Sequence, residues 1–248
     1  MSEPRILTID IETSPNLAHV WGLWQQNVSL NQLMQATTVI CWAAKWHGDK
    51  RVLFASDHHD GHEAMVKAAH ALLDEADIVV HYNGNSFDMP HLRREFLLAG
   101  LGPTSPWKDV DLMRVVKSRF RFVSNKLQHV STQLGLKGKL GHSGHDLWVR
   151  CMAGDDKAWA LMRRYNVQDV RLTEELYDRL LPWIPAHPHR ALWTGEEAPS
   201  CGRCGGTRLQ RRGCQVTPTG SFQRFQCQGC GGWSRGGKSQ ARVDVRPV

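Results

Sequence analysis

Apolar and polar residues alternate over residues 5–12, the first segment of the chain with a clear period. Leu7, Ile9 and Ile11 lie on one face, and Ile6, Thr8, Asp10 and Glu12 on the other. This period of two predicts a β-strand. Apolar segments at 38–46 and 51–55 predict two further strands, joined by a turn at Gly48-Asp49 into an antiparallel run. The sheet therefore begins with two carboxylates on one face of its first strand.

Helical periods follow. Over residues 61–75, Ala64, Ala68, Ala71 and Leu72 recur at helical spacing, and residues 76–81 return to the sheet as an apolar strand. The next predicted helix, residues 87–101, has Asp88 at its start, Pro90 in its first turn, and Leu92, Phe96 and Ala99 on its buried face. Further helices are predicted over 110–118, 126–134, 145–152 and 156–181.

Composition and charge divide the chain. With 248 residues, 41% apolar and 22% charged, it can form one full core and a small annex. Residues 1–182 hold equal numbers of acidic and basic side chains, so the whole net charge of +7 lies after Pro182. A basic appendage is suited to phosphate backbones, although a surface selected for solubility would look similar.

We expect three parts: residues 1–182, a linker with several Pro and Trp residues at 183–199, and a basic module at 200–248. No segment has the length and apolarity of a membrane span, and the first residues do not resemble a secretion signal. The expected location is the cytoplasm.

Four acidic residues in three motifs are the main candidates for chemistry. Asp10 and Glu12 lie in Asp-Ile-Glu-Thr, Asp88 follows Asn83-Gly84-Asn85-Ser86-Phe87, and Asp169 closes Tyr-Asn-Val-Gln-Asp. Carboxylate oxygens suit magnesium and manganese, and a pair of such ions can generate hydroxide and stabilise the leaving oxygen of a phosphodiester. Each motif alone is weak, because its acid could be a helix cap or an ion-pair partner. Together they predict a metal-dependent nuclease.

These motifs resemble the three exonuclease motifs of the DnaQ-like, or DEDD, superfamily, and Tyr165 marks its DEDDy branch. The resemblance spans about residues 5–181, and this part of the chain is similar to the proofreading exonuclease domain of family B DNA polymerases. It implies a ribonuclease H-like α/β fold, with a mixed sheet flanked by helices. It also implies two Mg²⁺ or Mn²⁺ ions, with Asp10 bridging both, Glu12 and Asp169 on the nucleophile side, and Asp88 on the leaving-group side, largely through water. Tyr165 would orient the attacking water.

The resemblance also suggests substrate contacts. Asn83, Asn85 and Phe87 are candidates to surround the terminal nucleotide, and Lys126 to contact a phosphate. Alternatively, Asn83-Gly84 is only a turn and Phe87 is core. His142 and His145 precede the third motif, where the other DEDD branch places a general base, but Tyr165 occupies that place here.

The second candidate site contains four cysteines. Cys201 and Cys204, and then Cys227 and Cys230, form two Cys-x-x-Cys motifs whose following glycines allow backbone amides to approach the sulfurs. Segments 207–216 and 221–226 flank a turn, as in a hairpin, so the module resembles a zinc ribbon with one structural Zn²⁺. Disulfides and a redox dithiol are the alternatives, and two matched motifs without a secretion signal favour zinc.

Basic and aromatic side chains alternate in this module, which suits phosphates and stacked bases. The basic set is Arg208, Arg211, Arg212, Arg224, Arg235 and Lys238, interleaved with Phe222, Phe225 and Trp233. Arg211, Arg212 and Arg224 are the candidates for nucleic-acid contact. Zinc ribbons also bind proteins, so a partner from replication or repair is the alternative.

By resemblance, the chain would degrade single-stranded DNA, or a frayed duplex end, from 3′ to 5′ and release nucleoside monophosphates. Two rivals stay open. An exoribonuclease would use the same metal site, since contacts to a 2′-hydroxyl cannot be identified from the sequence. A non-catalytic adaptor for nucleic acid or protein would keep the fold without the reaction.

Overall fold

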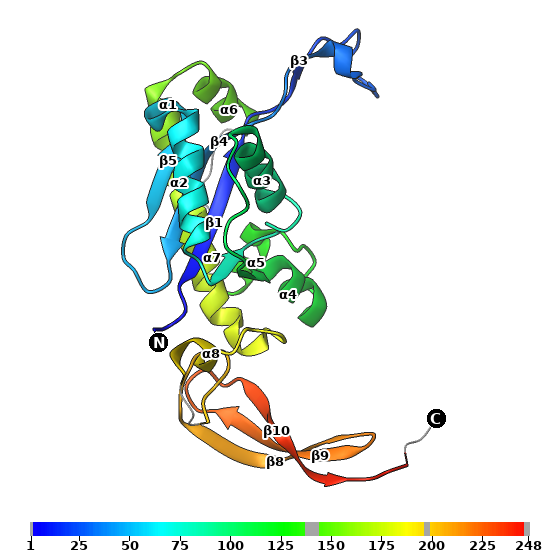
Figure 1. The fold of residues 1–248 in the computed structure, drawn as a ribbon. Coiled ribbons are helices and arrows are strands. Elements are labelled where there is room, and N and C mark those ends of the chain that lie inside the picture. The colour runs from blue at the N-terminus through cyan, green and yellow to red at the C-terminus, as the bar shows by residue number, and fades with distance from the viewer. Residues whose placement is uncertain (1, 137–143, 196–198, 246–248) are drawn as a thin grey trace.

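A mixed five-stranded sheet forms the centre of the molecule in the computed structural model, which describes residues 2–136, 144–195 and 199–245 (Figure 1). Its strands are β1 (Ile6–Thr13), β4 (Val39–Trp46), β5 (Leu53–Ser56), β6 (Ile78–His81) and β7 (Lys108–Asp111). The order is β5-β4-β1-β6-β7, with β4 antiparallel to both neighbours and β6 parallel to both of its own. β1 is therefore central, and Asp10 and Glu12 lie on it.

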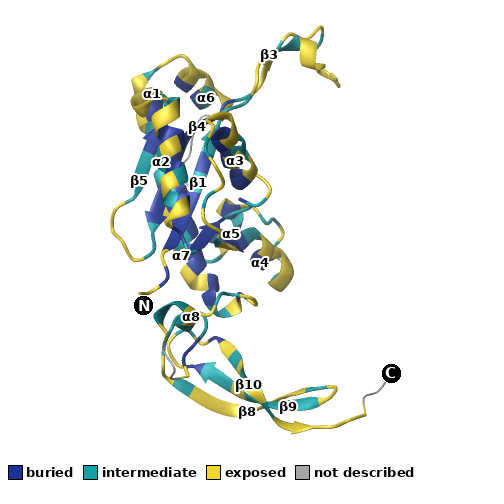
Figure 2. Cartoon of the chain, in the orientation of Figure 1, coloured by how far each residue is buried: buried dark blue, intermediate teal, exposed yellow. Residues whose placement is uncertain are grey.

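Helices cover both faces of this sheet. Leu7, Ile9 and Ile11 pack with α2 (His62–Asp74) and α3 (Asp88–Leu98). Ile6 packs on the opposite face with α4 (Leu112–Arg119), α5 (Leu127–Gln133) and α7 (Asp156–Leu180). Short α1 (Asp57–Asp60) precedes α2, and α6 (His145–Met152) packs with α7 against β4. The period of two in β1 thus places each apolar set in its own layer, which confirms the predicted mixed sheet flanked by helices. Figure 2 shows that the central strands are largely buried.

Three predicted details are wrong. The buried face of α2 consists of Met65, Val66, Ala69 and Leu73, because the larger side chains define the contact and the alanine-rich stripe lies beside it. Ala99 ends α3 and is exposed. The helix predicted from residue 110 begins at Leu112, since residues 108–111 pair with β6 and Asp111 caps the helix by accepting from the amides of Met113 and Arg114.

An arm leaves the sheet directly after β1. It contains β2 (Leu17–Ala18), the 3₁₀-helix η1 (Leu30–Gln32) and β3 (Leu33–Gln35), and it returns at β4. Ser14 and Thr38 hydrogen-bond across its base, where the Arg94 guanidinium also donates to the Thr37 carbonyl at 2.6 Å. The Trp21 and Trp24 side chains are 99% and 81% exposed, so they do not pack into the core.

The C-terminal part forms a separate three-stranded sheet, β8 (Leu209–Thr217), β9 (Gly220–Cys227) and β10 (Trp233–Arg242), in the order β10-β9-β8. The predicted hairpin is β8-β9, and β10 adds an unpredicted third strand. Between the sheets, η2 (Leu181–Trp183) and α8 (Ala191–Thr194) follow α7, and Trp193 packs against the core beneath β6 and α7. Among the described residues, no helix combines the length and apolarity needed to cross a bilayer.

Candidate functional site

Three acidic side chains meet beside the carboxyl end of β1. One oxygen each from Asp10, Glu12 and Asp169 lie within 4.8 Å of one another. Asp10 and Glu12 share a face of β1, and Asp169 reaches them from the buried side of α7, which packs against β1. Three carboxylates at this separation repel one another unless cations lie between them. The donor set is entirely oxygen and therefore fits a hard divalent cation.

Asp88 is not a member of this set. It begins α3, is 4% exposed, and its Oδ1 accepts from the Ile11 amide at 3.0 Å, between the two acids of β1. Burial raises the pKa of its carboxyl group to about 6. Of the four carboxylates predicted to cluster, three converge, and the fourth, that of Asp88, lies next to β1 and is held by the Ile11 backbone amide.

Asn166 is a site residue that was not predicted from the sequence. Its side-chain amide donates to Asp10 Oδ2 at 2.7 Å and to the Asp10 carbonyl at 3.2 Å. Both partners are acceptors, so the amide nitrogen must face Asp10. The signal was its position three residues before Asp169, on the same face of α7. Asn166 orients Asp10 within the carboxylate set.

Tyr165 lies on α7 one turn before Asp169 and is 8% exposed. Its ring meets the Trp148 ring of α6 edge to face, with centroids 6.3 Å apart. This packing positions the tyrosine on the helix that carries Asp169. Of the two histidines considered instead, His145 begins α6, and His142 lies outside the described residues.

The turn that precedes Asp88 is held by buried polar groups. The Gly84 amide donates to His81 Nδ1 at 3.0 Å, so the His81 proton is on Nε2 and faces Asp109 Oδ1 at 3.3 Å. The backbone amide of Asn83 donates to Asp111 Oδ1 at 3.0 Å, and Asn83 adopts a left-handed conformation with φ of 71°. The turn is thereby fixed to β6 and β7, and with it the start of α3.

Gly84 has no room for a side chain, because a Cβ there would lie 2.4 Å from Cγ of the buried His81 ring. We expect Gly84→Ala to cost about 1–3 kcal/mol of unfolding free energy and to displace Asp88. Urea unfolding followed by circular dichroism measures the cost. Gly102→Ala is the matched control, since a Cβ there meets nothing within 4 Å. Equal stability of the two variants would contradict this account of the turn.

The predicted substrate contacts have different surroundings. Phe87 is 40% exposed, so it does not occupy the core position considered as the alternative. Its ring packs against that of His91, with the ring centroids 4.8 Å apart. Asn83 forms the turn, and Asn85 is half-buried. Lys126 is exposed at the start of α5, in a loop tied to β6 by the Tyr82 hydroxyl, which donates to the Asn125 carbonyl at 2.6 Å.

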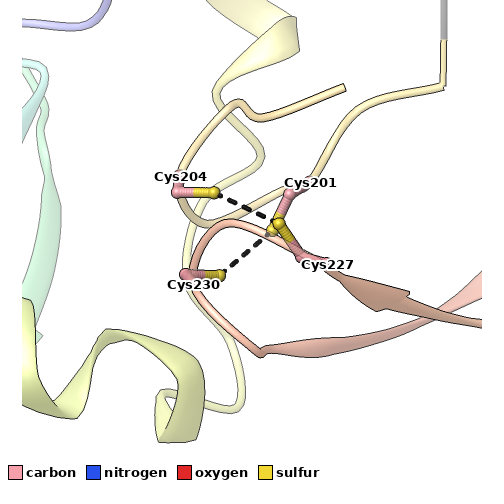
Figure 3. Close-up of side chains that lie close together, drawn as sticks. All are labelled: Cys201, Cys204, Cys227 and Cys230. Atoms are coloured by element: carbon pink, nitrogen blue, oxygen red, sulfur yellow. Dashed lines mark hydrogen bonds between the residues drawn. The ribbon is translucent and has the colours of Figure 1, made fainter. Parts of the chain in front are cut away.

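The four cysteines converge as predicted (Figure 3). Their sulfurs lie within 4.8 Å of one another, with Cys201 and Cys230 Sγ 3.7 Å apart and Cys204 and Cys227 Sγ 3.6 Å apart. None of them is in a disulfide. Metal–sulfur bonds of about 2.3 Å in a tetrahedron place sulfurs about 3.8 Å apart, close to what is seen. The arrangement fits one tetrahedral metal ion.

Backbone amides support these sulfurs. The Gly232 amide points to Cys230 Sγ at 3.4 Å, as predicted for a glycine that follows the motif, and the amide of Gly229, inside the motif, points to Cys227 Sγ at 3.3 Å. Burial raises the pKa of the Cys227 thiol, but amide hydrogen bonds outweigh it and lower the pKa to about 7. A thiolate, the form that binds metal, is thus favoured at Cys227, whereas burial raises the pKa of the Cys204 thiol and raises that of the Cys230 thiol to about 12. Cys41 and Cys151 are buried elsewhere, and Cys214 is exposed on β8.

Comparison with known proteins places this fold. Residues 29–181, more than half of the chain, match the RNase_H superfamily. The chain belongs to the RNase H superfamily. The matched range includes β4 to β7 and all of α7, and it begins after β1, the strand that carries Asp10 and Glu12.

This RNase H superfamily protein is similar to a solved structure, that of the family B DNA polymerase from the hyperthermophilic archaeon Pyrobaculum calidifontis. The TM-score is 0.55, with 18% sequence identity over 88% of this chain and 32% of the polymerase chain. This chain therefore spans about a third of that protein, and at this identity the likeness concerns the fold. None of the curated proteins compared with the sequence matches it.

Proposed function

We propose that this RNase H superfamily protein is a metal-dependent 3′-to-5′ exonuclease that hydrolyses single-stranded DNA ends and releases nucleoside monophosphates. The convergence of Asp10, Glu12 and Asp169 carries the proposal, because three carboxylate oxygens within 4.8 Å of one another need divalent cations. The fold of a superfamily of nucleases and the likeness to a DNA polymerase support action on nucleic acid.

Each residue has a separate task. Asp10, Glu12 and Asp169 would hold two Mg²⁺ or Mn²⁺ ions, and Asp88 would act on the leaving-group side, largely through water. When bound, these ions supply a nucleophilic hydroxide and stabilise the leaving oxygen. Tyr165 would orient the attacking water through its phenol hydroxyl, which can donate or accept a hydrogen bond and, while protonated, adds no negative charge. Asn166 fixes Asp10, while Asn83, Asn85, Phe87 and Lys126 are the candidate contacts to the terminal nucleotides.

We further propose that the cysteine set binds one structural Zn²⁺ in a basic ribbon, residues 200–248, joined by residues 183–199 to a catalytic domain of residues 1–182. The sulfur spacing and the amide hydrogen bonds to two of the sulfurs support zinc. DNA is the expected partner of the ribbon, and a replication or repair protein is the alternative.

The direct test uses a 5′-labelled single-stranded DNA with Mg²⁺ or Mn²⁺, with EDTA, and with EDTA followed by excess Mg²⁺. We expect a ladder that shortens from the 3′ end, stops with EDTA, resumes with Mg²⁺, and is absent for Asp10→Ala. A ladder that persists in Asp10→Ala would show that another site or a contaminant cuts the DNA.

The same assay separates the two rivals. Matched DNA and RNA oligonucleotides, digested side by side, decide between a deoxyribonuclease and an exoribonuclease. If the protein binds these oligonucleotides but cuts neither with any divalent metal, the hypothesis of a non-catalytic adaptor replaces that of an exonuclease.

A further inference from the structure

We propose that a cleft between the linker and the three-stranded sheet binds consecutive backbone phosphates of a nucleic-acid strand, chiefly through Arg224 and Arg235. This inference names a second contact site for the substrate, distant from the carboxylates. Its catalytic consequence rests on the proposed exonuclease function, but the binding itself does not.

The two arginines form a like-charged pair. Arg235 on β10 lies directly opposite Arg224 on β9 in the antiparallel register, so their side chains share one face of the sheet. Opposed residues have Cβ atoms about 4.5–5.5 Å apart, where like charges destabilise the sheet. None of the ion pairs among the described residues involves either arginine. Asp244 is the sole acidic side chain from 199 to 248, and the two acids of the linker, Glu196 and Glu197, lie outside the described residues.

Aromatic rings on the same face hold the two guanidinium groups in place. Arg224 lies over the Trp233 ring, 4.8 Å from its centre, and Arg235 lies over the Phe222 ring at 4.5 Å. Arg224 Nε donates to the Arg212 carbonyl at 3.0 Å, which leaves its two terminal nitrogens for a ligand. A stacked, oriented guanidinium with open terminal nitrogens is arranged for bidentate binding of phosphate.

Together with the linker, Arg224 and Arg235 line a cleft of about 360 Å³. His189, Arg203 and Trp233 are also among its walls. Arg203 spans it structurally, since Nε donates to the Ile184 carbonyl and Nη1 to the Trp233 carbonyl, both at 2.9 Å. None of the described residues that line the cleft is acidic. Trp233 is 42% exposed, and the Arg212 guanidinium also lies over its ring, 5.7 Å from the centre. The concentration of positive charge thus has a definite shape, which a surface selected for solubility does not require.

The cleft lies far from the carboxylates. α7 continues for eleven residues from Asp169 to Leu180 before the linker begins, which is about 16 Å at 1.5 Å per residue. In Figure 1 the three-stranded sheet lies at the end of the molecule opposite the arm, and Glu12 is next to the arm. At about 3.4 Å per nucleotide, a stacked strand needs about five nucleotides to reach both places. A trinucleotide stacked in this way at the carboxylates is too short to reach the cleft.

Binding is tested with a fluorescein-labelled 20-nucleotide single-stranded DNA, by anisotropy without added divalent metal and at several salt concentrations. For Arg224→Gln/Arg235→Gln we expect affinity to fall on the order of tenfold and the salt slope to fall by about 1.4, as for two lost phosphate contacts. Arg208→Gln/Arg242→Gln removes the same charge outside the cleft and should have a much smaller effect. Unchanged affinity in the first pair, or an equal loss in both, overturns the proposal. Zinc content confirms that each ribbon is folded.

Cleavage of two substrate lengths tests the geometry. We expect the Arg224→Gln/Arg235→Gln pair to slow cleavage of a subsaturating 20-mer while leaving a trinucleotide unaffected. An equal loss on both lengths would contradict a remote site. If wild type cuts neither substrate, the exonuclease proposal fails, while the anisotropy result still decides whether the cleft binds nucleic acid.

Discussion

Asp169→Asn is expected to lower the rate of nucleotide release on the order of 10³-fold or more while leaving the protein folded. The change keeps the shape of the side chain but removes one of three charges whose oxygens lie within 4.8 Å of one another. The cation then loses a charged ligand, and the loss should appear in kcat more than in KM. Initial rates on labelled DNA at saturating Mg²⁺ measure it.

A thermal readout separates loss of metal binding from misfolding. A ligand that binds only the folded state raises the melting temperature in proportion to RT ln(1 + [L]/Kd). Mn²⁺ should therefore stabilise wild type, and Asp169→Asn should lose most of that shift. Glu175→Gln is the matched control, because Glu175 is an exposed acid on the same helix. If Mn²⁺ raises the melting temperature of Asp169→Asn as much as that of wild type, Asp169 is not a metal ligand. If Glu175→Gln also loses the rise, the effect comes from general negative charge rather than from the site.

The carboxylate site was largely predictable because it depends on short periods in the sequence. Alternation in β1 places Asp10 and Glu12 on one face, and Asp88 begins its helix as predicted. Asp88's hydrogen bond to Ile11 was not predictable, because it depends on how α3 sits against β1, 77 residues away in the chain. The contact from Asn166 to Asp10 spans 156 residues and was missed for the same reason.

The C-terminal sheet shows the opposite balance. The metal motif is local, and four cysteines in two pairs are enough to predict that the sulfurs meet. β10 was missed because residues 233–242 contain two consecutive glycines and few apolar side chains, and they become a strand only by pairing with β9. The opposition of Arg224 and Arg235 follows from that pairing and cannot be read from either segment alone.

Cys227→Ser is expected to abolish the proposed zinc binding and to unfold residues 200–245, while residues 6–184 stay folded. From 199 to 245 the described buried residues are Ser200, Cys201, Cys227 and Gly232, so the sheet has almost no apolar core. Metal binding must then supply most of its folding free energy. The three apolar clusters of the larger domain draw their buried residues from positions 6–184 and do not need it.

Metal analysis and limited proteolysis check this expectation together. Wild type should contain one zinc per chain and resist cleavage, whereas Cys227→Ser should contain little zinc and be trimmed to a resistant fragment that ends near residue 184. Cys214→Ser is the control, because Cys214 is exposed on β8 and outside the sulfur cluster. A zinc-free Cys227→Ser protein with a protease-resistant ribbon would mean that strand pairing alone holds the sheet. Loss of zinc from Cys214→Ser would mean that the ligand set differs from the four converging sulfurs.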